Sequence, residues 1–211
     1  MNCRVACEQE EIANRLTQLD LSSEAIRVAV AEGEQARASC SVNDPSIAPG
    51  FFAWARTTRG LRDHLAPLGW RKCDDGGLDT VLSKDGSVAI VVSTGSRETG
   101  IASGCPKTKS PKGPRTEVAV CINQMCLFVE YDSPPCQDIP RGRITWFLLV
   151  ARDGDEVRCE LSLPAGIGED GRVDEWQERI ILEPVRSDTV PKVDRADDQP
   201  DVGVDVAIMA E

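Results

Sequence analysis

Histidine is almost absent from this sequence, because His64 is the one histidine among 211 residues. A site built on two or more histidines is therefore excluded. Aromatic residues make up 4% of the chain, so the core has to be mainly aliphatic. No run of about 18 apolar residues occurs, which argues against a membrane span. The N-terminus has no basic region followed by an apolar one, so we expect no signal peptide and a cytoplasmic location.

Cysteine is frequent, but its spacing points away from metal and disulfide chemistry. None of the nine cysteines forms a CxxC motif, and the closest pairs are Cys3 with Cys7 and Cys121 with Cys126. Structural zinc sites usually carry closer pairs, often together with histidines. An odd count in a reducing compartment favours free thiols. We expect no metal, no cofactor and no catalytic residue among them.

The acidic balance limits the classes of partner. The chain has 24 lysine and arginine residues against 35 aspartate and glutamate residues, with a net charge of −11 and a pI near 4.7. Such a protein does not coat nucleic acid or an anionic membrane with its whole surface, because like charges repel. A local basic patch is still compatible with this balance.

The strongest fold signal is a β-hairpin with an Asp-Gly turn at 153–154. This turn lies between two runs rich in β-branched and large apolar residues, 144–150 and 157–163. A two-residue turn sets the register, so Arg152 is expected opposite Asp155. The predicted pairs then alternate between an apolar side and a more polar side.

The two sides of this hairpin predict different environments. On one side Leu148 faces Cys159 and Trp146 faces Leu161, so that side belongs to the core. On the other side the second strand carries charged residues such as Glu160. We therefore expect the first strand to be central and the second to lie nearer a sheet edge or to be half covered.

Hydrophobic periodicity predicts the other elements. Helical spacing covers 8–19 and 22–38, which we expect to form an antiparallel helical hairpin, and it returns from Phe51 to Leu68 after a linker at 43–50. The remaining predictions are a hairpin of 80–83 with 87–93, a helix at 116–125, a strand at 127–131, a loop at 132–142 and a last strand at 176–182.

Together these elements predict an α+β fold, in which an antiparallel sheet of hairpins is packed by amphipathic helices. We divide the chain into an N-terminal helical hairpin and linker at 1–49, an α+β core domain at 50–183 and an acidic disordered tail at 184–211. The tail is assigned from its many aspartates and its scarce apolar residues.

The segment 94–116 is the best candidate for a binding site. It is rich in glycine, serine, threonine and proline, which predicts a loop, and its cations suit contacts with successive phosphates. A nucleic-acid or phosphate site here would use Lys107, Lys109, Lys112, Arg115, Gly95 and Gly100. The loop has no Walker spacing and no aromatic residue for base stacking, so a solvated basic loop is the alternative interpretation.

Four separated segments carry a resemblance. They are the helix at 54–70 with Arg-Gly-Leu-Arg at 59–62, the strand and loop at 90–100, the segment 109–116 with Pro-Lys-Gly-Pro at 111–114, and 160–180 with Glu-Leu-Ser-Leu-Pro at its start. This pattern resembles a group of small uncharacterised proteins carried on bacterial plasmids and integrative elements. The resemblance implies a mobile-element context and transfers no catalytic residues.

These patterns favour a non-catalytic accessory protein that binds a protein partner, such as a host-defence or DNA-processing protein, and that has no membrane partner. The alternative is nucleic-acid or phosphate binding by the loop 94–116. An enzyme is disfavoured. A nuclease site can be drawn from Asp79, Glu98 and Lys107, because two acids and a lysine suit metal-assisted phosphodiester cleavage, but their spacing matches no motif.

Overall fold

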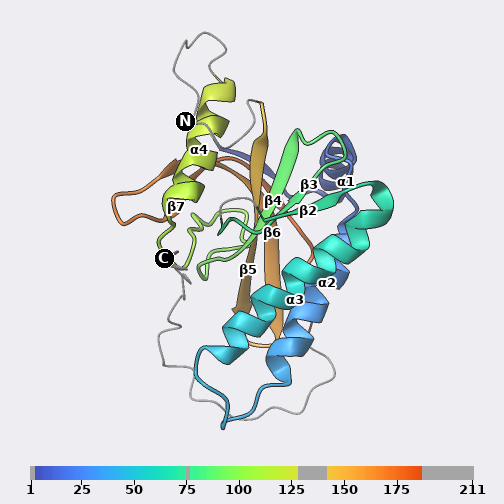
Figure 1. Cartoon of the computed structure of the whole chain (residues 1–211), viewed down its shortest axis with the longest axis vertical. Helices are drawn as coiled ribbons and strands as arrows, with labels where there is room; N and C mark the ends of the chain where they lie inside the picture. The colour runs from blue at the N-terminus through green and yellow to red at the C-terminus, as the bar shows by residue number, and fades with distance from the viewer. Residues whose placement is uncertain (1–2, 75–76, 128–141, 187–211) are drawn as a thin grey trace.

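The computed structural model describes residues 3–74, 77–127 and 142–186, and these ranges form four α-helices and a mixed, mostly antiparallel open sheet of eight strands (Figure 1). The helices are α1 (Gln9–Gln18), α2 (Ser23–Ala38), α3 (Ala48–Leu65) and α4 (Pro114–Leu127), and a short 3-10 helix, η1 (Ala66–Leu68), continues α3. The strands are β1 (Arg4–Ala6), β2 (Arg71–Cys73), β3 (Thr80–Leu82), β4 (Val88–Thr94), β5 (Ile144–Asp153), β6 (Glu156–Ile167), β7 (Val173–Ile181) and β8 (Val185–Arg186).

The sheet has the order β1-β7-β6-β5-β4-β3-β2, and β8 adds to one end of β6. The two predicted hairpins, β3–β4 and β5–β6, are confirmed. The predicted antiparallel sheet of hairpins is confirmed in part: the sheet is mostly antiparallel, but β4 pairs with β5 in parallel and β1 pairs with β7 in parallel. A parallel pair needs a long crossover, and α4 lies between β4 and β5 along the chain.

The register of the β5–β6 hairpin differs from the prediction: each residue of β5 pairs with a residue of β6 two positions further along the chain than predicted. Asp153 pairs with Glu156, so the turn residues are Gly154 and Asp155, and Gly154 takes the left-handed φ of 59°. Leu148 therefore faces Leu161 instead of Cys159. The shift is even, so the same side chains still point into the core.

The strand β6 lies inside the sheet, between β5 and β7, whereas its alternating pattern predicted a strand nearer an edge or half covered. Glu160 is fully buried there and binds Arg179 of β7. The predicted alternation of apolar and charged residues along β6 is confirmed. The side of β6 that carries Glu160 is, however, covered by protein and not by water.

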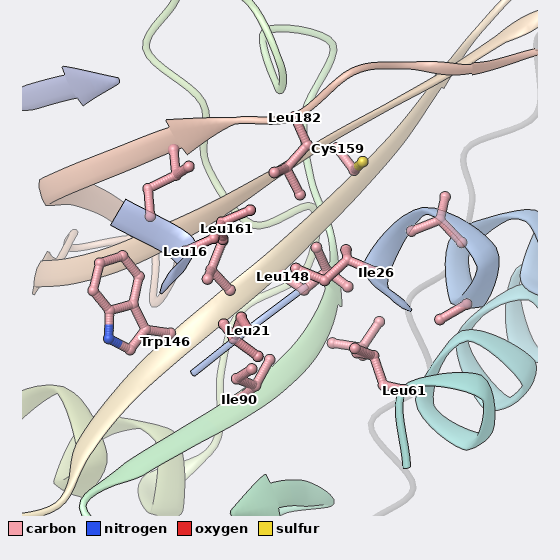
Figure 2. Close-up of a cluster of buried hydrophobic side chains, with 14 of the residues drawn as sticks. Leu16, Leu21, Ile26, Leu61, Ile90, Trp146, Leu148, Cys159, Leu161 and Leu182 are labelled. Carbon is pink, nitrogen blue, oxygen red and sulfur yellow. The ribbon is translucent and has the colours of Figure 1, made fainter. Parts of the chain in front are cut away.

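The two faces of the sheet are covered by different layers (Figure 1). On one face α1, α2 and α3 pack on an aliphatic core, where Leu16, Ile26 and Leu61 meet Leu148 and Leu161 (Figure 2). Burying each such side chain contributes about 1.5–3 kcal/mol. On the other face a smaller cluster, which includes Phe147, Val120 and Trp176, lies beneath α4 and the loop that follows β4.

The helix α2 packs along α3 and not along α1, which corrects the predicted α1–α2 hairpin (Figure 1). Two glycines permit this approach. A methyl group on Gly60 would lie 2.9 Å from Ala29 Cα, and one on Gly33 would lie 2.7 Å from the Ala53 carbonyl oxygen. Both distances are shorter than those that Cβ atoms show in proteins. The two helices can therefore pack this closely only because glycine occupies positions 33 and 60.

The ends of the elements follow ordinary capping chemistry. The Ser22 hydroxyl accepts a hydrogen bond from Ala25 N and caps α2. The helix α3 begins at Ala48, earlier than predicted, because Pro49 fits the first turn of a helix. The helix α4 and the strand β7 confirm the predictions at 116–125 and 176–182, and both begin before the predicted residue.

Some predictions fall on residues outside the described ranges. They are the predicted acidic tail at 184–211 beyond residue 186, the predicted loop at 132–142 as far as residue 141, and most of the strand at 127–131. The start of the predicted disordered tail is corrected, because Val185 and Arg186 form the strand β8. Residues 3–38, which we assigned to a separate N-terminal part, contribute Ala6, Leu16 and Ile26 to the same core cluster as the sheet. Within the described ranges, no helix combines the length and the apolar character needed to cross a bilayer.

Candidate functional site

A cleft of about 650 Å³ opens between α3, η1 and the strand β2. We call it the α3 cleft. Its walls combine two tryptophans with a group of charged side chains. The residues used below are Trp54, Thr58, Arg59, Arg62, Asp63, Trp70, Arg71, Lys72 and Asp79.

Helical geometry places one wall of the α3 cleft. Trp54, Thr58 and Arg62 follow each other at intervals of four, so they share one face of α3. The opposite wall begins at Gly69, whose left-handed φ of 88° ends η1 and turns the chain into β2. Trp70, which follows this turn, is 3% exposed and donates its indole N–H to the Asp20 carbonyl oxygen at 3.2 Å.

A charged cluster closes one end of the α3 cleft. The guanidinium of Arg62 donates to Asp74, lies 3.5 Å from Asp79 Oδ1 and lies 3.4 Å from the Thr80 carbonyl oxygen. Lys72 Nζ lies 2.6 Å from Asp74 Oδ2. The carboxylates of Asp74 and Asp79 therefore share two cations, Arg62 from α3 and Lys72 from β2.

The two carboxyl groups of this cluster titrate in opposite directions. The hydrogen bond from Lys72 lowers the pKa of Asp74, whereas burial, followed by the hydrogen bond with Asp74, raises the pKa of Asp79. Like charges in contact resist ionising together, so Asp79 holds a proton more readily than Asp74 does. A carboxyl group with a raised pKa in a cleft is a common property of binding and catalytic sites.

Two polar atoms beside this cluster have no hydrogen-bond partner among the described residues, namely Thr58 Oγ1 and Arg62 Nε. Thr58 is 5% exposed. A buried donor without an acceptor costs about 1–3 kcal/mol, so native proteins usually satisfy such atoms. Their position in the wall of the α3 cleft makes a bound acceptor a natural partner.

An exposed aromatic surface adjoins the α3 cleft. Phe51 is 45% exposed and Phe52 is 41% exposed, and the Phe51 ring lies 5.9 Å from both Phe52 and Trp54, measured between centroids. We call these three residues the α3 ridge. Exposed apolar side chains are ordinary when they are scattered singly, whereas contiguous apolar patches mark interaction sites, so the clustering of these rings is the informative feature.

The loop at 95–113, which contains most of the predicted phosphate site, lies on the other face of the sheet. Its charges point outward at Lys107 and Lys109, which are exposed, whereas Lys112 and Arg115 are half-buried. Lys107 Nζ is 3.9 Å from Asp170 Oδ2. Arg115 lies in the first turn of α4, and Lys112 lies two residues before that helix.

The two glycines of the predicted phosphate site donate their amides inside the protein. Gly95 N donates to the Val150 carbonyl oxygen at 2.9 Å, and Gly100 N donates to Glu160 Oε2 at 2.8 Å. Gly100 has a φ of 75°, which suits glycine, and its amide does approach an anion. That anion is a carboxylate of the protein itself.

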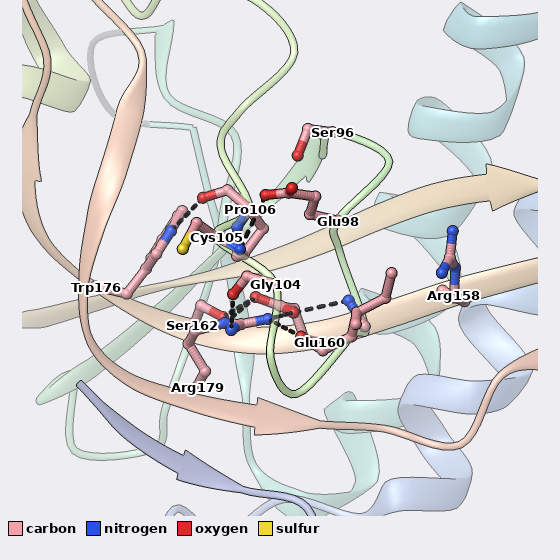
Figure 3. A network of polar contacts seen from close by, with 12 residues as sticks. Ser96, Glu98, Gly104, Cys105, Pro106, Arg158, Glu160, Ser162, Trp176 and Arg179 are labelled. Carbon is pink, nitrogen blue, oxygen red and sulfur yellow. Dashed lines mark hydrogen bonds and ion pairs between the residues drawn. The ribbon is translucent and has the colours of Figure 1, made fainter.

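Glu160 and Arg179 form the buried centre of this second region (Figure 3). Their side chains are 0% and 3% exposed and are joined by bonds of 3.0 and 2.6 Å. Arg179 also donates to the carbonyl oxygens of Ile101 and Gly104, and Ser162 donates to Glu160. Each charge is satisfied, so this pair holds the loop against the sheet.

The nuclease arrangement drawn from the sequence is not assembled. Asp79 interacts with Arg62 of α3, whereas Glu98 accepts a hydrogen bond from Cys105 N within the loop. Lys107 lies near Asp170. His64 Nε2 lies 2.9 Å from Glu32 Oε1 and joins α3 to α2, in agreement with a structural role.

The α3 cleft was missed by sequence reasoning. Trp54 and Thr58 follow the same helical spacing as Leu61 and Leu65, and the structure does bury Thr58 and pack Trp54 against the core, so this pattern gives no sign of a cleft. The charged cluster arises only where α3 meets β2 and the residues before β3. The nearest sequence signal is the cluster of Arg59, Arg62, Arg71 and Lys72 in an acidic chain.

Comparisons with protein-family models, with curated proteins and with solved structures found no match to this chain. Function is therefore inferred from the geometry of the α3 cleft and the α3 ridge.

Proposed function

We propose that this chain is a non-catalytic accessory protein that binds a protein partner through the α3 ridge and the adjoining α3 cleft. The observation that carries the proposal is the exposure of Phe51 and Phe52 near the start of α3, a helix that is fully buried further along at Leu61 and Leu65. The protein has few aromatic residues, and three of them gather here. Aromatic residues and arginine dominate the energetic centres of protein interfaces.

The mixed charges around the α3 ridge favour a protein over a nucleic acid. Arg59 pairs with Asp63 and Arg62 pairs with Asp74, so carboxylates interrupt the cations. A phosphate backbone is tracked by cations alone, and interspersed carboxylates repel it. The resemblance to plasmid and integrative-element proteins adds a mobile-element setting, in which the partner is a host-defence or DNA-processing protein.

The experiment compares the tagged full-length protein with its Phe51→Ser/Phe52→Ser variant in a pull-down from host lysate, with and without nuclease. We expect the wild type to retain a stoichiometric protein that resists nuclease and the double variant to lose it. Val42→Ser is the matched control, because Val42 is 65% exposed and lies before α3. Equal capture by all three proteins contradicts the proposal.

The second candidate is nucleic-acid or phosphate binding by the loop at 95–113, supported by the outward lysines Lys107 and Lys109 on a loop that is held in place. Replacement of Lys107, Lys109 and Lys112 by glutamine is expected to weaken nucleic-acid binding and to reduce its dependence on salt. Binding of a fluorescent oligonucleotide at several salt concentrations measures this, and unchanged binding rejects the candidate.

A further inference from the structure

We infer that the α3 cleft receives a carboxylate of the partner, and that the partner is an acidic segment with apolar side chains beside its acid. This inference rests on the proposed function and names the chemistry that the same surface recognises. The apolar part of the segment would lie on the α3 ridge, and its carboxylate would enter the charged end of the α3 cleft.

The charge of the α3 cleft differs from that of the chain as a whole. The cleft is lined by four cations and two carboxylates, and Asp74 beside it makes three carboxylates, whereas the whole chain has a net charge of −11. Arg71 is exposed, and the part of the chain that the structure describes offers it no carboxylate. One cation is thus left to attract an acidic group.

The unpartnered atoms specify what kind of group fits. Arg62 Nε–H can only donate, and the Thr58 hydroxyl can donate as well, so both lack an acceptor. They lie one helical turn apart on the same face of α3. A carboxylate offers two oxygens that accept several hydrogen bonds, and it is the usual partner of an arginine.

A carboxylate suits this position better than a phosphate. Asp63, Asp74 and Asp79 all lie at or beside the charged end of the α3 cleft. A doubly charged phosphate would meet stronger repulsion from them than a singly charged carboxylate does. The apolar walls formed by Trp54 and Trp70 also suit a side chain with an aliphatic stem.

The protein carries its own spectroscopic controls. Its four tryptophans divide into Trp54 and Trp70, which line the α3 cleft, and Trp146 and Trp176, which are buried at 1% and 6% exposure elsewhere. In the ¹⁵N-labelled full-length protein each indole N–H gives one signal. A ligand in the α3 cleft shifts the first two signals and leaves the other two in place.

The probe is a blocked hexapeptide of sequence Leu-Glu-Glu-Leu-Leu-Glu, and the matched probe has glutamine in place of glutamate. We expect the acidic peptide to shift the Trp54 and Trp70 signals saturably, and the glutamine peptide to bind roughly tenfold more weakly or worse. Arg71→Gln is expected to abolish the difference between the two peptides. Arg56→Gln is the control, since Arg56 is exposed on α3 but does not line the cleft.

Other results overturn the inference. Equal shifts by both peptides, or shifts produced by inorganic phosphate or single-stranded DNA and not by the acidic peptide, show that the cleft does not select a carboxylate. The inference and the proposed function fail separately. If the Phe51→Ser/Phe52→Ser variant loses the captured protein while Arg71→Gln retains it, the partner surface stands and the carboxylate site is rejected.

Discussion

Two charged clusters of this protein use the same residue types under different conditions. Glu160 and Arg179 are completely buried, and every donor and acceptor of the pair is satisfied by the loop at 95–113 or by β6. Arg62 with Asp74 and Asp79 is partly exposed and leaves Arg62 Nε without an acceptor. The complete burial of the first cluster fits a role in folding, and the open position of the second is what our proposal of a binding site rests on.

The largest expected effect comes from breaking the buried pair. Arg179→Gln should lower the free energy of unfolding by about 3–5 kcal/mol, because it leaves the Glu160 carboxylate buried without its counter-charge. Urea denaturation followed by tryptophan fluorescence measures this. Adding Glu160→Gln to the variant should recover part of the loss. A loss below about 1 kcal/mol for the single change would mean that the loop is held by other contacts.

The same substitution in the exposed cluster should have a smaller effect on stability. Arg62→Gln is expected to lower the free energy of unfolding by about 1 kcal/mol, since the side chain is 20% exposed and Asp74 keeps its contact with Lys72. Urea denaturation of both arginine variants under one set of conditions makes the comparison direct. If Arg62→Gln costs as much as Arg179→Gln, the proposed division between folding and binding clusters is wrong.

The smallest expected effect is a dependence on pH. The folded protein raises the pKa of Asp79 above its ordinary value of 3.8, so as pH rises through this range the unfolded chain loses its proton first. The ionised Asp79 carboxylate therefore destabilises the folded protein above its folded pKa. Well below pH 3.8 Asp79 is protonated in both the folded and the unfolded states and has no effect on stability. The stability of Asp79→Asn relative to wild type should therefore increase between about pH 3 and pH 7.

Asp74 changes stability in the opposite sense. Its lowered pKa makes it stabilising above 3.8, and this contribution is lost as pH falls through the folded pKa. Asp74→Asn should therefore lose stability relative to wild type as pH rises, in the same denaturation series. Parallel curves for the two variants would show that the carboxyl groups do not interact as described.

Much of the fold follows from sequence patterns. The alternation in β5 and β6 correctly placed Trp146, Leu148 and Leu161 in the core, because period two leaves only two sides to choose from. The same pattern could not tell that Glu160 faces protein. A strand with one polar side has the same sequence pattern whether that side faces water or forms a buried ion pair. The loop that covers Glu160 lies about 60 residues away in the chain, so local sequence gives no sign of it.

The candidate site was less predictable than the fold. Each residue of the α3 cleft has an ordinary interpretation in its own element, with Trp54 in a buried stripe and Arg71 on a short strand. Their common site depends on how α3 crosses the β2–β3 edge, which local periodicity does not encode. The exposure of Phe51 and Phe52 likewise depends on which face of α3 the sheet and α2 leave open.

The pairing of β1 with β7 has a consequence for the order in which this protein folds. Arg4 lies opposite Glu178, so β1 gains its neighbouring strand only after most of the described chain has been synthesised. Contacts this distant in sequence form slowly, because a long chain has to be closed. The ion pair of Glu160 also waits for β7. Completion of β7 is therefore the event that locks both the N-terminal strand and the loop at 95–113 into the native structure.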